Sequence, residues 1–355
     1  MSLLDHLTMR ILQDGPISVA AYMTECLLHP TLGYYTTRDP LGPQGDFTTS
    51  PEISQMFGEV IGLCLAQSWM DQGQPSRFIL GELGPGRGTL MADVLRATRR
   101  VPGFHQAAKV VLLEVSPELK KKQAETLREY APEWVDNIAE FPDLPLYLVA
   151  NEFFDALPIR QFLRDGDSWR ERLVGVSAGS LTFGLGPRTE QSGLKHRMDD
   201  TTDGDLVELC SAAIPILTTV AQKIATCGGS ALIVDYGDWR SLGDTLQAMQ
   251  NHKHSHPLEN PGQADLTSHV DFEALAGAAR AAGCAYTRLT PQGVFLERLG
   301  ITARAQTLAN SLEGSELEGL IAAHRRLTHP EEMGNLFKVL GLYPAQSAPP
   351  PGLDS

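Results

Sequence analysis

The stretch that decides the fold is residues 77–90, which read RFILGELGPGRGTL. The apolar run Arg77–Leu83 predicts a buried strand, and the apolar spacing from Leu90 to Leu95 predicts a helix. Four glycines fall within the eight residues from Gly81 to Gly88. Glycine at this density lets a backbone pass close to a ligand. A strand, a glycine-rich turn and a helix predict a ligand site at the carboxyl end of that strand.

The same alternation continues along the chain. Further strands are predicted at Lys109–Val115, Leu146–Ala150, Ser230–Asp235 and Met333–Leu342, with helical segments between them. Strands alternating with helices predict an α/β fold with a doubly wound, Rossmann-like, mostly parallel sheet and helices on both faces.

Three further regions complete the predicted organisation. Residues 1–75 form a mostly helical N-terminal extension that we expect to line part of the cleft, including a helix that begins at Ser50 and runs through Leu65. The α/β core is expected at 76–345, with a β-hairpin insertion at 156–204, a loop-rich one at 238–268 and an amphipathic helix at 205–226. The tail, 346–355, is predicted to be disordered.

Composition excludes several classes of protein. The net charge of −14 argues against a nucleic-acid partner, which requires a positive surface. No apolar run is long enough for a membrane span. The five cysteines lack a CxxC spacing, which argues against a zinc knuckle. The N-terminus lacks the features of a signal peptide, so we expect a cytoplasmic location.

The spacing of the glycines narrows the ligand. A dinucleotide fingerprint requires G-x-G-x-x-G, but its third glycine position is Thr89, and a Walker A loop requires a lysine that this stretch lacks. Glu82 is instead followed by Gly84, Gly86 and Gly88. A carboxylate that can meet an ammonium group, beside a loop that admits an amino-acid moiety, indicates S-adenosyl-L-methionine. A tight turn selected only for packing is the alternative.

Two acidic residues extend this prediction. Glu114 ends the next strand, where a carboxylate can accept hydrogen bonds from ribose hydroxyls. Asp136 follows a third predicted strand near Trp134 and is a candidate for the adenine amino group. An exposed glutamate at a strand end is the alternative for Glu114.

The segment NEFFDALP, residues 151–158, directly follows the fourth strand. Asn151, Glu152 and Asp155 are the candidate catalytic residues, because carboxylates can orient a guanidinium acceptor and help remove its proton. In the alternative interpretation, Asp155 only caps a turn and Asn151 or Glu152 lines the pocket.

Two further segments are polar. GDFTTSPE, residues 45–52, leads into a helix N-terminus and predicts that Asp46, Phe47, Thr48 and Thr49 close over the cofactor; a plain capping loop is equally compatible. His252, His254 and His256 alternate along the chain, but without a nearby cysteine or helical histidine pair we expect no metal there.

Taken together, these motifs resemble the MidA-type family of class I S-adenosylmethionine-dependent methyltransferases, which includes the mitochondrial arginine methyltransferase that assists complex I assembly. The resemblance rests on the following stretches: HPTLGYY (29–35), GDFTTSPEISQMFGE (45–59), ELGPGRGTL (82–90), NEFFDALP (151–158), DYG (235–237), DLTSHVDF (265–272) and MGNLFKVL (333–340). It implies a seven-stranded sheet and a protein arginine side chain as acceptor, for example in a respiratory complex subunit. The alternatives are a non-catalytic assembly factor with the same fold and, disfavoured by the glycine spacing, a nicotinamide-dependent oxidoreductase.

Overall fold

The computed structural model describes residues 1–37, 48–250 and 253–355. The chain divides into two compact units. The larger comprises Thr48–Phe154, Ile214–Trp239 and Phe272–Ser355, and the smaller comprises Met1–Phe47, Asp155–Ala213 and Arg240–Asp271. The units differ from the expected division: residues 48–75 belong with the strands and helices of the larger unit, because the buried face of their helix packs in its core.

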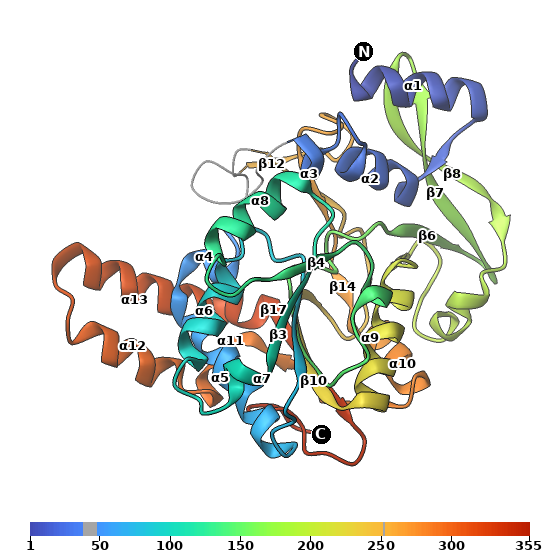
Figure 1. Cartoon of the computed structure of the whole chain (residues 1–355). Helices are drawn as coiled ribbons and strands as arrows, with labels where there is room; N and C mark the ends of the chain where they lie inside the picture. Colours follow the sequence, from blue (N-terminus) through green and yellow to red (C-terminus); the bar gives the residue numbers. More distant parts are fainter. Residues whose placement is uncertain (38–47, 251–252) are drawn as a thin grey trace. The chain divides into compact units, whose positions relative to one another are not determined.

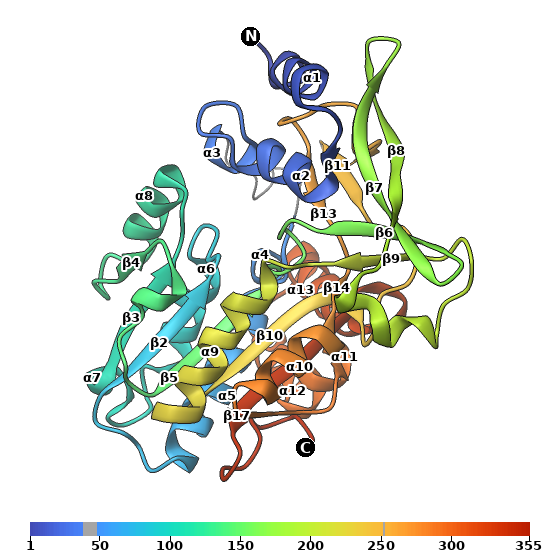
Figure 2. The ribbon, with the colours of Figure 1, turned by 90° about the vertical axis from the view of Figure 1, so that its right-hand side faces the viewer.

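The larger unit contains one mixed sheet in the order β15-β17-β10-β5-β2-β3-β4 (Figures 1 and 2). Strands β10, β5, β2, β3 and β4 run parallel, whereas β17 pairs antiparallel with both β10 and β15. The strand bounds are β2 Phe78–Leu83, β3 Ala108–Leu113, β4 Glu133–Val135, β5 Leu146–Asn151, β10 Gly229–Asp238, β15 Cys284–Tyr286, β16 Thr290–Pro291 and β17 Phe337–Pro344. The predicted Rossmann-like, mostly parallel sheet is confirmed along this path of seven strands, and the short strand β16 pairs antiparallel with β17 beside the path.

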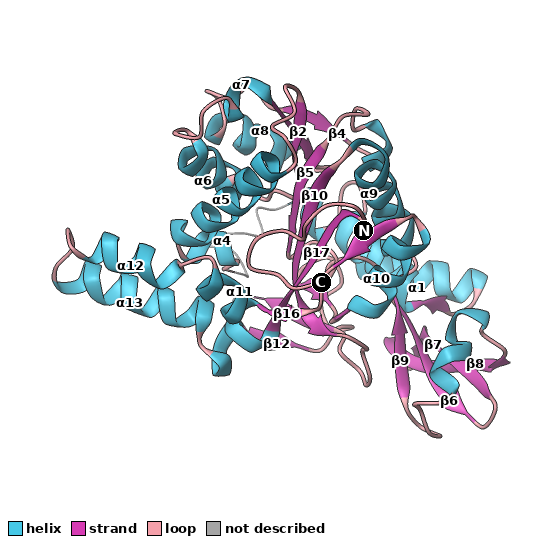
Figure 3. Ribbon diagram, turned by 90° about the horizontal axis from the view of Figure 1, so that it is seen from below, coloured by secondary structure: helices cyan, strands magenta, loops and turns pink. Residues whose placement is uncertain are grey.

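Helices cover both faces of this sheet. Figure 3 shows α5, α6 and α11 on one side and α9 and α10 on the other. The helix bounds are α4 Ser50–Ile53, α5 Gln55–Asp71, α6 Thr89–Thr98, α7 Phe104–Ala107, α8 Pro117–Thr126, α9 Ala213–Cys227, α10 Phe272–Ala281, α11 Gln292–Arg298, α12 Ile301–Ala309 and α13 Gly314–Thr328. The main core lies between the first of these helical layers and apolar side chains of β2, β3, β5, β10 and β17.

The smaller unit combines N-terminal helices with the hairpins of the insertion. Its elements are α1 Leu3–Asp14, β1 Ile17–Ser18, α2 Val19–Leu28, α3 Tyr34–Thr37, β6 Arg160–Asp165, β7 Ser168–Ser177, β8 Ser180–Thr189, β9 Leu206–Leu209, β11 Gln247–Gln250, β12 Lys253–Ser255, β13 Asp265–Thr267 and β14 Val270–Asp271. Strand β7 pairs antiparallel with β6, β8 and β1. Side chains of α1, α2, β7, β11 and β13 share one apolar core.

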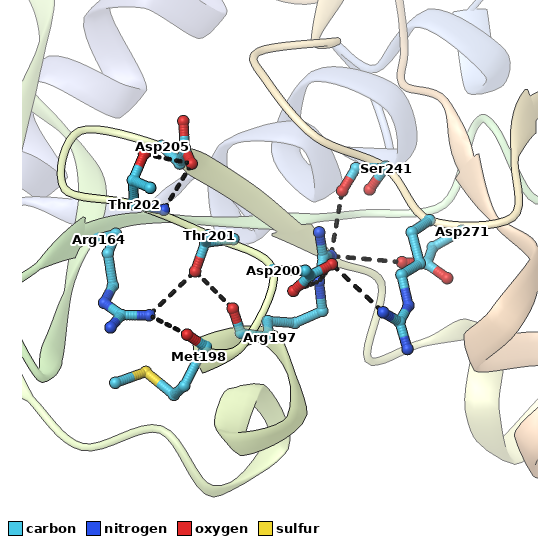
Figure 4. A network of polar contacts seen from close by, with 10 residues as sticks. Arg164, Arg197, Met198, Asp200, Thr201, Thr202, Asp205, Ser241 and Asp271 are labelled. Atoms are coloured by element: carbon cyan, nitrogen blue, oxygen red, sulfur yellow. Dashed lines mark hydrogen bonds and ion pairs between the residues drawn. The ribbon is translucent and has the colours of Figure 1, made fainter.

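A buried arginine fastens the insertion of this unit (Figure 4). Arg197 is 2% exposed, and its Nε donates to both carboxylate oxygens of Asp200 at 3.0 and 3.1 Å. Its Nη1 donates to the carbonyl oxygen of Ser241 at 3.1 Å. A guanidinium taken out of water must be paired in this way, so Arg197 ties residues 192–205 to the segment that follows β10.

Three local predictions differ from the structure. The helix expected from Ser50 is split: Ser54 is extended and its side chain caps α5 by accepting from Met56 N at 3.2 Å. The helix expected at 205–226 begins only at Ala213. Leu206 and Leu209 lie instead on β9, which pairs with β6. The tail is ordered rather than disordered: Leu353 is buried in the core, and Arg298 donates to Gly352 O at 3.1 Å.

Among the described residues, no helix is both long enough and apolar enough to span a membrane.

Candidate functional site

The glycine loop lies between the end of β2 and the start of α6. Gly84, Gly86 and Gly88 all have positive φ values, +61°, +55° and +81°. This conformation strains any residue with a Cβ atom. A Cβ on Gly84 would also lie 2.9 Å from Cδ2 of Phe153 in the NEFFDALP segment. The three glycines are therefore required by the backbone itself, and the loop contacts the turn after β5.

Glu82 lies at the end of β2, next to this loop. Its side chain is 3% exposed, and Oε2 has no hydrogen-bond partner within the described part of the chain. Burial raises the pKa of Glu82 to about 8, with a smaller contribution from the negative charge of Glu114 and an opposing one from a backbone hydrogen bond with Met91. A buried carboxyl group with an unused oxygen suits a cationic partner such as an ammonium group.

Glu114 follows β3 and is also buried. Its Oε1 accepts from the backbone N–H groups of Val115 and Ser116 at 2.9 and 2.8 Å, and Oε2 accepts from Gln123 Nε2 at 3.1 Å. Burial raises its pKa despite these bonds. A carboxylate has about four lone-pair positions, so the three donors to Glu114 leave an acceptor position for a ribose hydroxyl.

Gln123 joins Glu114 to the glycine loop. Besides Glu114, its Nε2 donates to the carbonyl oxygen of Gly86 at 2.7 Å, and its Oε1 accepts from Trp134 Nε1 at 2.7 Å. Gln123 lies on α8 and is completely buried. The sequence alone does not reveal the role of Gln123, because nothing in its local pattern distinguishes it from other polar positions of an amphipathic helix.

Asp136 stays a prediction. It lies just beyond β4, where its carboxylate pairs with Lys120 Nζ at 2.6 Å and its side chain is 71% exposed. To bind an adenine amino group, this carboxylate has to release or share the lysine.

Two acidic side chains of the larger unit, Glu152 and Asp235, hold the turn after β5. Glu152 has φ +51°, and its Oε1 accepts from Ser50 N at 2.9 Å and from Asn151 Nδ2 at 3.0 Å. The Oδ1 atom of Asn151 is buried and has no partner within residues 1–37, 48–250 and 253–355. Asn151 and Glu152 thus lie together at the carboxyl end of β5.

Asp235 supports this turn from the neighbouring strand. It lies in β10, is fully buried, and its Oδ2 accepts from the N–H groups of Phe153 and Phe154 at 3.2 and 2.9 Å. Its Oδ1 accepts from Tyr236 N at 3.0 Å. The motif DYG, residues 235–237, is one of the stretches that carry the family resemblance. Only the register of β10 beside β5 reveals that Asp235 positions the turn.

Four residues that are predicted to close over the cofactor, Asp46, Phe47, Thr48 and Thr49, precede α4 in the chain. Asp46 and Phe47 lie outside the described residues. Thr49 is the N-cap of α4 but makes no side-chain capping bond, and Thr48 directly precedes it. The first N–H group of α4, that of Ser50, is taken by Glu152. A carboxylate of the protein therefore occupies this N–H group, and the contacts of Thr48 and Thr49 with the cofactor stay a prediction.

Asp155 belongs to the smaller unit. Its side chain is 5% exposed, and its carbonyl oxygen accepts from Ser268 N at 2.9 Å. In the same unit the hydroxyl of Tyr35 donates to Asp265 at 2.9 Å, and burial together with Asp265 and Asp155 raises the pKa of Tyr35. Asp155 therefore lies near another buried acidic side chain, Asp265, and its catalytic role stays a prediction.

Two histidines of the alternating cluster are described. His254 is exposed on β12, and His256 Nδ1 accepts from Leu258 N at 3.2 Å. His252 lies outside the described residues.

Comparison with known proteins decides the family. Residues 60–290 match the family model Methyltransf_28, described as S-adenosyl-L-methionine-dependent methyltransferase. The chain belongs to this family. The methyltransferase is 40% identical to the Danio rerio protein arginine methyltransferase NDUFAF7, mitochondrial, over 95% of this chain and 86% of the relative. It is 37% identical to the Homo sapiens protein of the same name, over 97% and 84%.

A solved structure agrees with this assignment. The methyltransferase superposes with a TM-score of 0.83 on a Burkholderia thailandensis protein crystallised with S-adenosyl-homocysteine, at 28% identity, covering 99% of this chain and 92% of that one. The predicted family, fold and cofactor are thereby confirmed. The expected cytoplasmic location is contradicted, because the curated relatives are named as mitochondrial.

The residues of the larger unit fit the cofactor of this family. In the glycine loop Gly84 is exposed and Gly86 is partly exposed, so a ligand can approach their backbone where no Cβ atom stands. Glu82 offers a buried oxygen that still lacks a partner within the described chain. Glu114 retains one acceptor position. These groups match the amino-acid and ribose parts of S-adenosyl-L-methionine.

Proposed function

We propose that this methyltransferase transfers a methyl group to an arginine side chain of a protein. The single observation that carries the proposal is the contact between the glycine loop after β2 and the turn after β5, two neighbouring parallel strands. This contact puts the proposed cofactor residues next to Asn151 and Glu152. The arginine acceptor is supported by the curated relatives, which are named protein arginine methyltransferases.

The proposed division of tasks follows from the chemistry of each group. S-adenosyl-L-methionine supplies the electrophilic methyl group. Glu82 binds its ammonium group, and Gly84, Gly86 and Gly88 let the backbone approach it. Methyl transfer depends mainly on positioning, and a guanidinium presents five fixed N–H donors. Glu152 is the proposed carboxylate that orients this acceptor and receives its proton.

Asn151 and Asp155 are proposed for supporting tasks. Asn151 donates to Glu152 and keeps its carboxylate in place at the end of β5. Asp155 is a candidate for a second acceptor-orienting carboxylate, which Asp155→Asn tests separately. A respiratory complex subunit is the proposed source of the arginine; the family resemblance supports this choice.

The test is methylation of candidate partner proteins by the purified enzyme, read by tandem mass spectrometry. We expect methylarginine with the wild type and a loss of at least tenfold with Glu152→Gln, which retains an oxygen for Ser50 N. Methylation of a small molecule alone would refute the protein substrate. If cells that carry Glu152→Gln and Asp155→Asn keep full assembly of their respiratory complex, the chain acts there as a non-catalytic assembly factor.

A further inference from the structure

Three side chains that could ligate a metal lie together in the smaller unit, one on α1, one on α2 and one directly after α2 (dark blue in Figure 1). One ligand atom from each of His6, Glu25 and His29 lies within 4.8 Å of the other two. The imidazole Nε2 of His6 is 4.0 Å from Oε2 of Glu25, and the His6 and His29 rings meet edge to face at 5.3 Å. None of these residues has a role in the proposed methyl transfer.

The distances are compatible with a tetrahedral metal ion. Three atoms that lie within 4.8 Å of one another have a common centre at most roughly 2.8 Å from each. Zinc binds histidine nitrogen and carboxylate oxygen at about 2.0–2.2 Å. Each ligand atom therefore has to move by less than about 1 Å, and all three side chains are only partly buried, so rotation about their own bonds supplies this movement.

The local fold explains why these atoms converge. Glu25 and His29 are four residues apart, and His29 N donates to Glu25 O at 3.2 Å, which continues the helical turn at the end of α2. Residues at this spacing share one face of a helix. The third group, His6, comes from α1, whose buried residues pack in the same core as those of α2.

The carboxylate of Glu25 is already oriented by an outer partner. Arg10 Nη1 donates to Oε1 at 2.7 Å, which leaves Oε2 as the oxygen that lies toward His6. Metal-ligating groups are generally held by such outer hydrogen bonds, which fix their orientation. Arg10 also contributes a positive charge that lowers the affinity for a cation.

We propose that His6, Glu25 and His29 bind a divalent transition-metal ion of the zinc class and thereby join α1 to α2. Two imidazoles and a carboxylate select such an ion over Mg²⁺ or Ca²⁺, which prefer oxygen ligands. With three protein ligands, a water molecule completes the tetrahedron. His29 Nδ1 accepts a hydrogen bond from Thr31 N at 3.3 Å. A metal bound at Nε2 leaves the imidazole proton on Nδ1, so this long hydrogen bond is lost when the metal binds. We therefore expect a micromolar dissociation constant.

The experiment is a calorimetric titration of the chelator-treated full chain with Zn²⁺ at neutral pH. The wild type is expected to bind one ion. His6→Gln, Glu25→Gln and His29→Asn are expected to weaken binding at least tenfold, as even loss of an outer partner costs about 10–100-fold. His29→Asn retains an acceptor for Thr31 N, which protects the turn. His254→Ala, an exposed histidine of the same unit, is the matched control and should bind as the wild type.

A second measurement covers the case in which a variant folds poorly. Zn²⁺ should raise the thermal unfolding temperature of the wild type and of His254→Ala, because a ligand that binds only the folded state stabilises it, and it should leave His6→Gln unchanged. The proposal is overturned if the wild type does not bind Zn²⁺, if the three ligand variants bind it equally well, or if His254→Ala removes binding. Affinity for S-adenosyl-homocysteine should be the same in all these variants.

Discussion

The carboxylate of Glu152 accepts a hydrogen bond from the backbone N–H of Ser50 at 2.9 Å, across 102 residues of sequence. Ser50 is the first residue of the four-residue helix α4. On its other side, α4 is joined to the start of α6, because Thr89 Oγ1 donates to Glu52 Oε1 at 2.6 Å. The short helix α4 therefore connects the turn after β5 with the end of the glycine loop.

The first prediction separates the structural and chemical tasks of Glu152. Glu152→Gln keeps an oxygen for Ser50 N, so its thermal stability and its affinity for S-adenosyl-homocysteine should equal those of the wild type while kcat falls. Glu152→Ala removes the acceptor as well, and losing such a helix cap costs about 0.5–2 kcal/mol of stability. Calorimetry and initial-rate kinetics on both variants check this. Equal kcat in Glu152→Gln and the wild type would contradict the proposed role.

The second prediction concerns Thr89. Thr89→Val removes the hydroxyl that donates to Glu52 at nearly constant volume, and a hydrogen bond to a charged group contributes about 1.5–3 kcal/mol. We expect weaker cofactor binding, seen as a higher KM for S-adenosyl-L-methionine, and recovery in Thr89→Ser. A double-mutant cycle with Glu52→Gln should show coupling between the two sites. Additive effects of the two changes would mean that the bond has no role in cofactor binding.

The third prediction uses two glycines of the larger unit. Gly84→Ala combines a φ of +61° with a Cβ only 2.9 Å from the Phe153 ring, so it should abolish cofactor binding. Gly277 lies in α10, and apart from the adjacent backbone of its own helix no atom lies within 4 Å of a Cβ added there by Gly277→Ala. It should stabilise the protein by about 0.4–1 kcal/mol. Thermal unfolding and titration with S-adenosyl-homocysteine measure both effects. Retained binding in Gly84→Ala would show that the loop tolerates a side chain.

The fourth prediction is a dependence of stability on pH. Burial holds the pKa of Glu82 at about 8 in the folded chain, above its ordinary value of 4.5. Between these two pKa values, 4.5 and about 8, the folded protein keeps a proton that the unfolded chain has lost. The free energy of unfolding is therefore greatest below the unfolded pKa and falls as pH rises toward the folded pKa, by up to about 1.4 kcal/mol per pH unit. Glu114 contributes in the same direction. Glu82→Gln should flatten the dependence, whereas parallel curves for variant and wild type would contradict this pKa.

Much of the fold could be predicted because its signals are local. The apolar run Arg77–Leu83 became β2, and Leu146–Ala150 became β5, each within one residue of the expected bounds. Ser116 caps α8 by accepting from Leu119 N, with Pro117 at the first helical position. In each case short-range chemistry and tertiary packing favour the same structure, so a single sequence suffices.

The differences arise where distant contacts compete with local preference. The spacing of Leu206 and Leu209 fits a helix, but pairing with β6 makes the segment a strand. The polar tail was expected to be disordered, yet burial of Leu353 orders it. Within the site, the loop glycines have a pattern that the sequence displays directly. The bonds from Glu152 to Ser50 and from Asp235 to the turn depend on which strands become neighbours, which no local pattern encodes.

Titration calorimetry with S-adenosyl-homocysteine measures whether Glu82 and the glycine loop bind S-adenosyl-L-methionine. We expect one site on the wild type, at least tenfold weaker binding to Glu82→Gln, and unchanged binding to Asp143→Asn, an exposed carboxylate paired with Lys223. Binding to Glu82→Gln with the affinity of the wild type, or no binding to the wild type at millimolar ligand, would contradict this expectation.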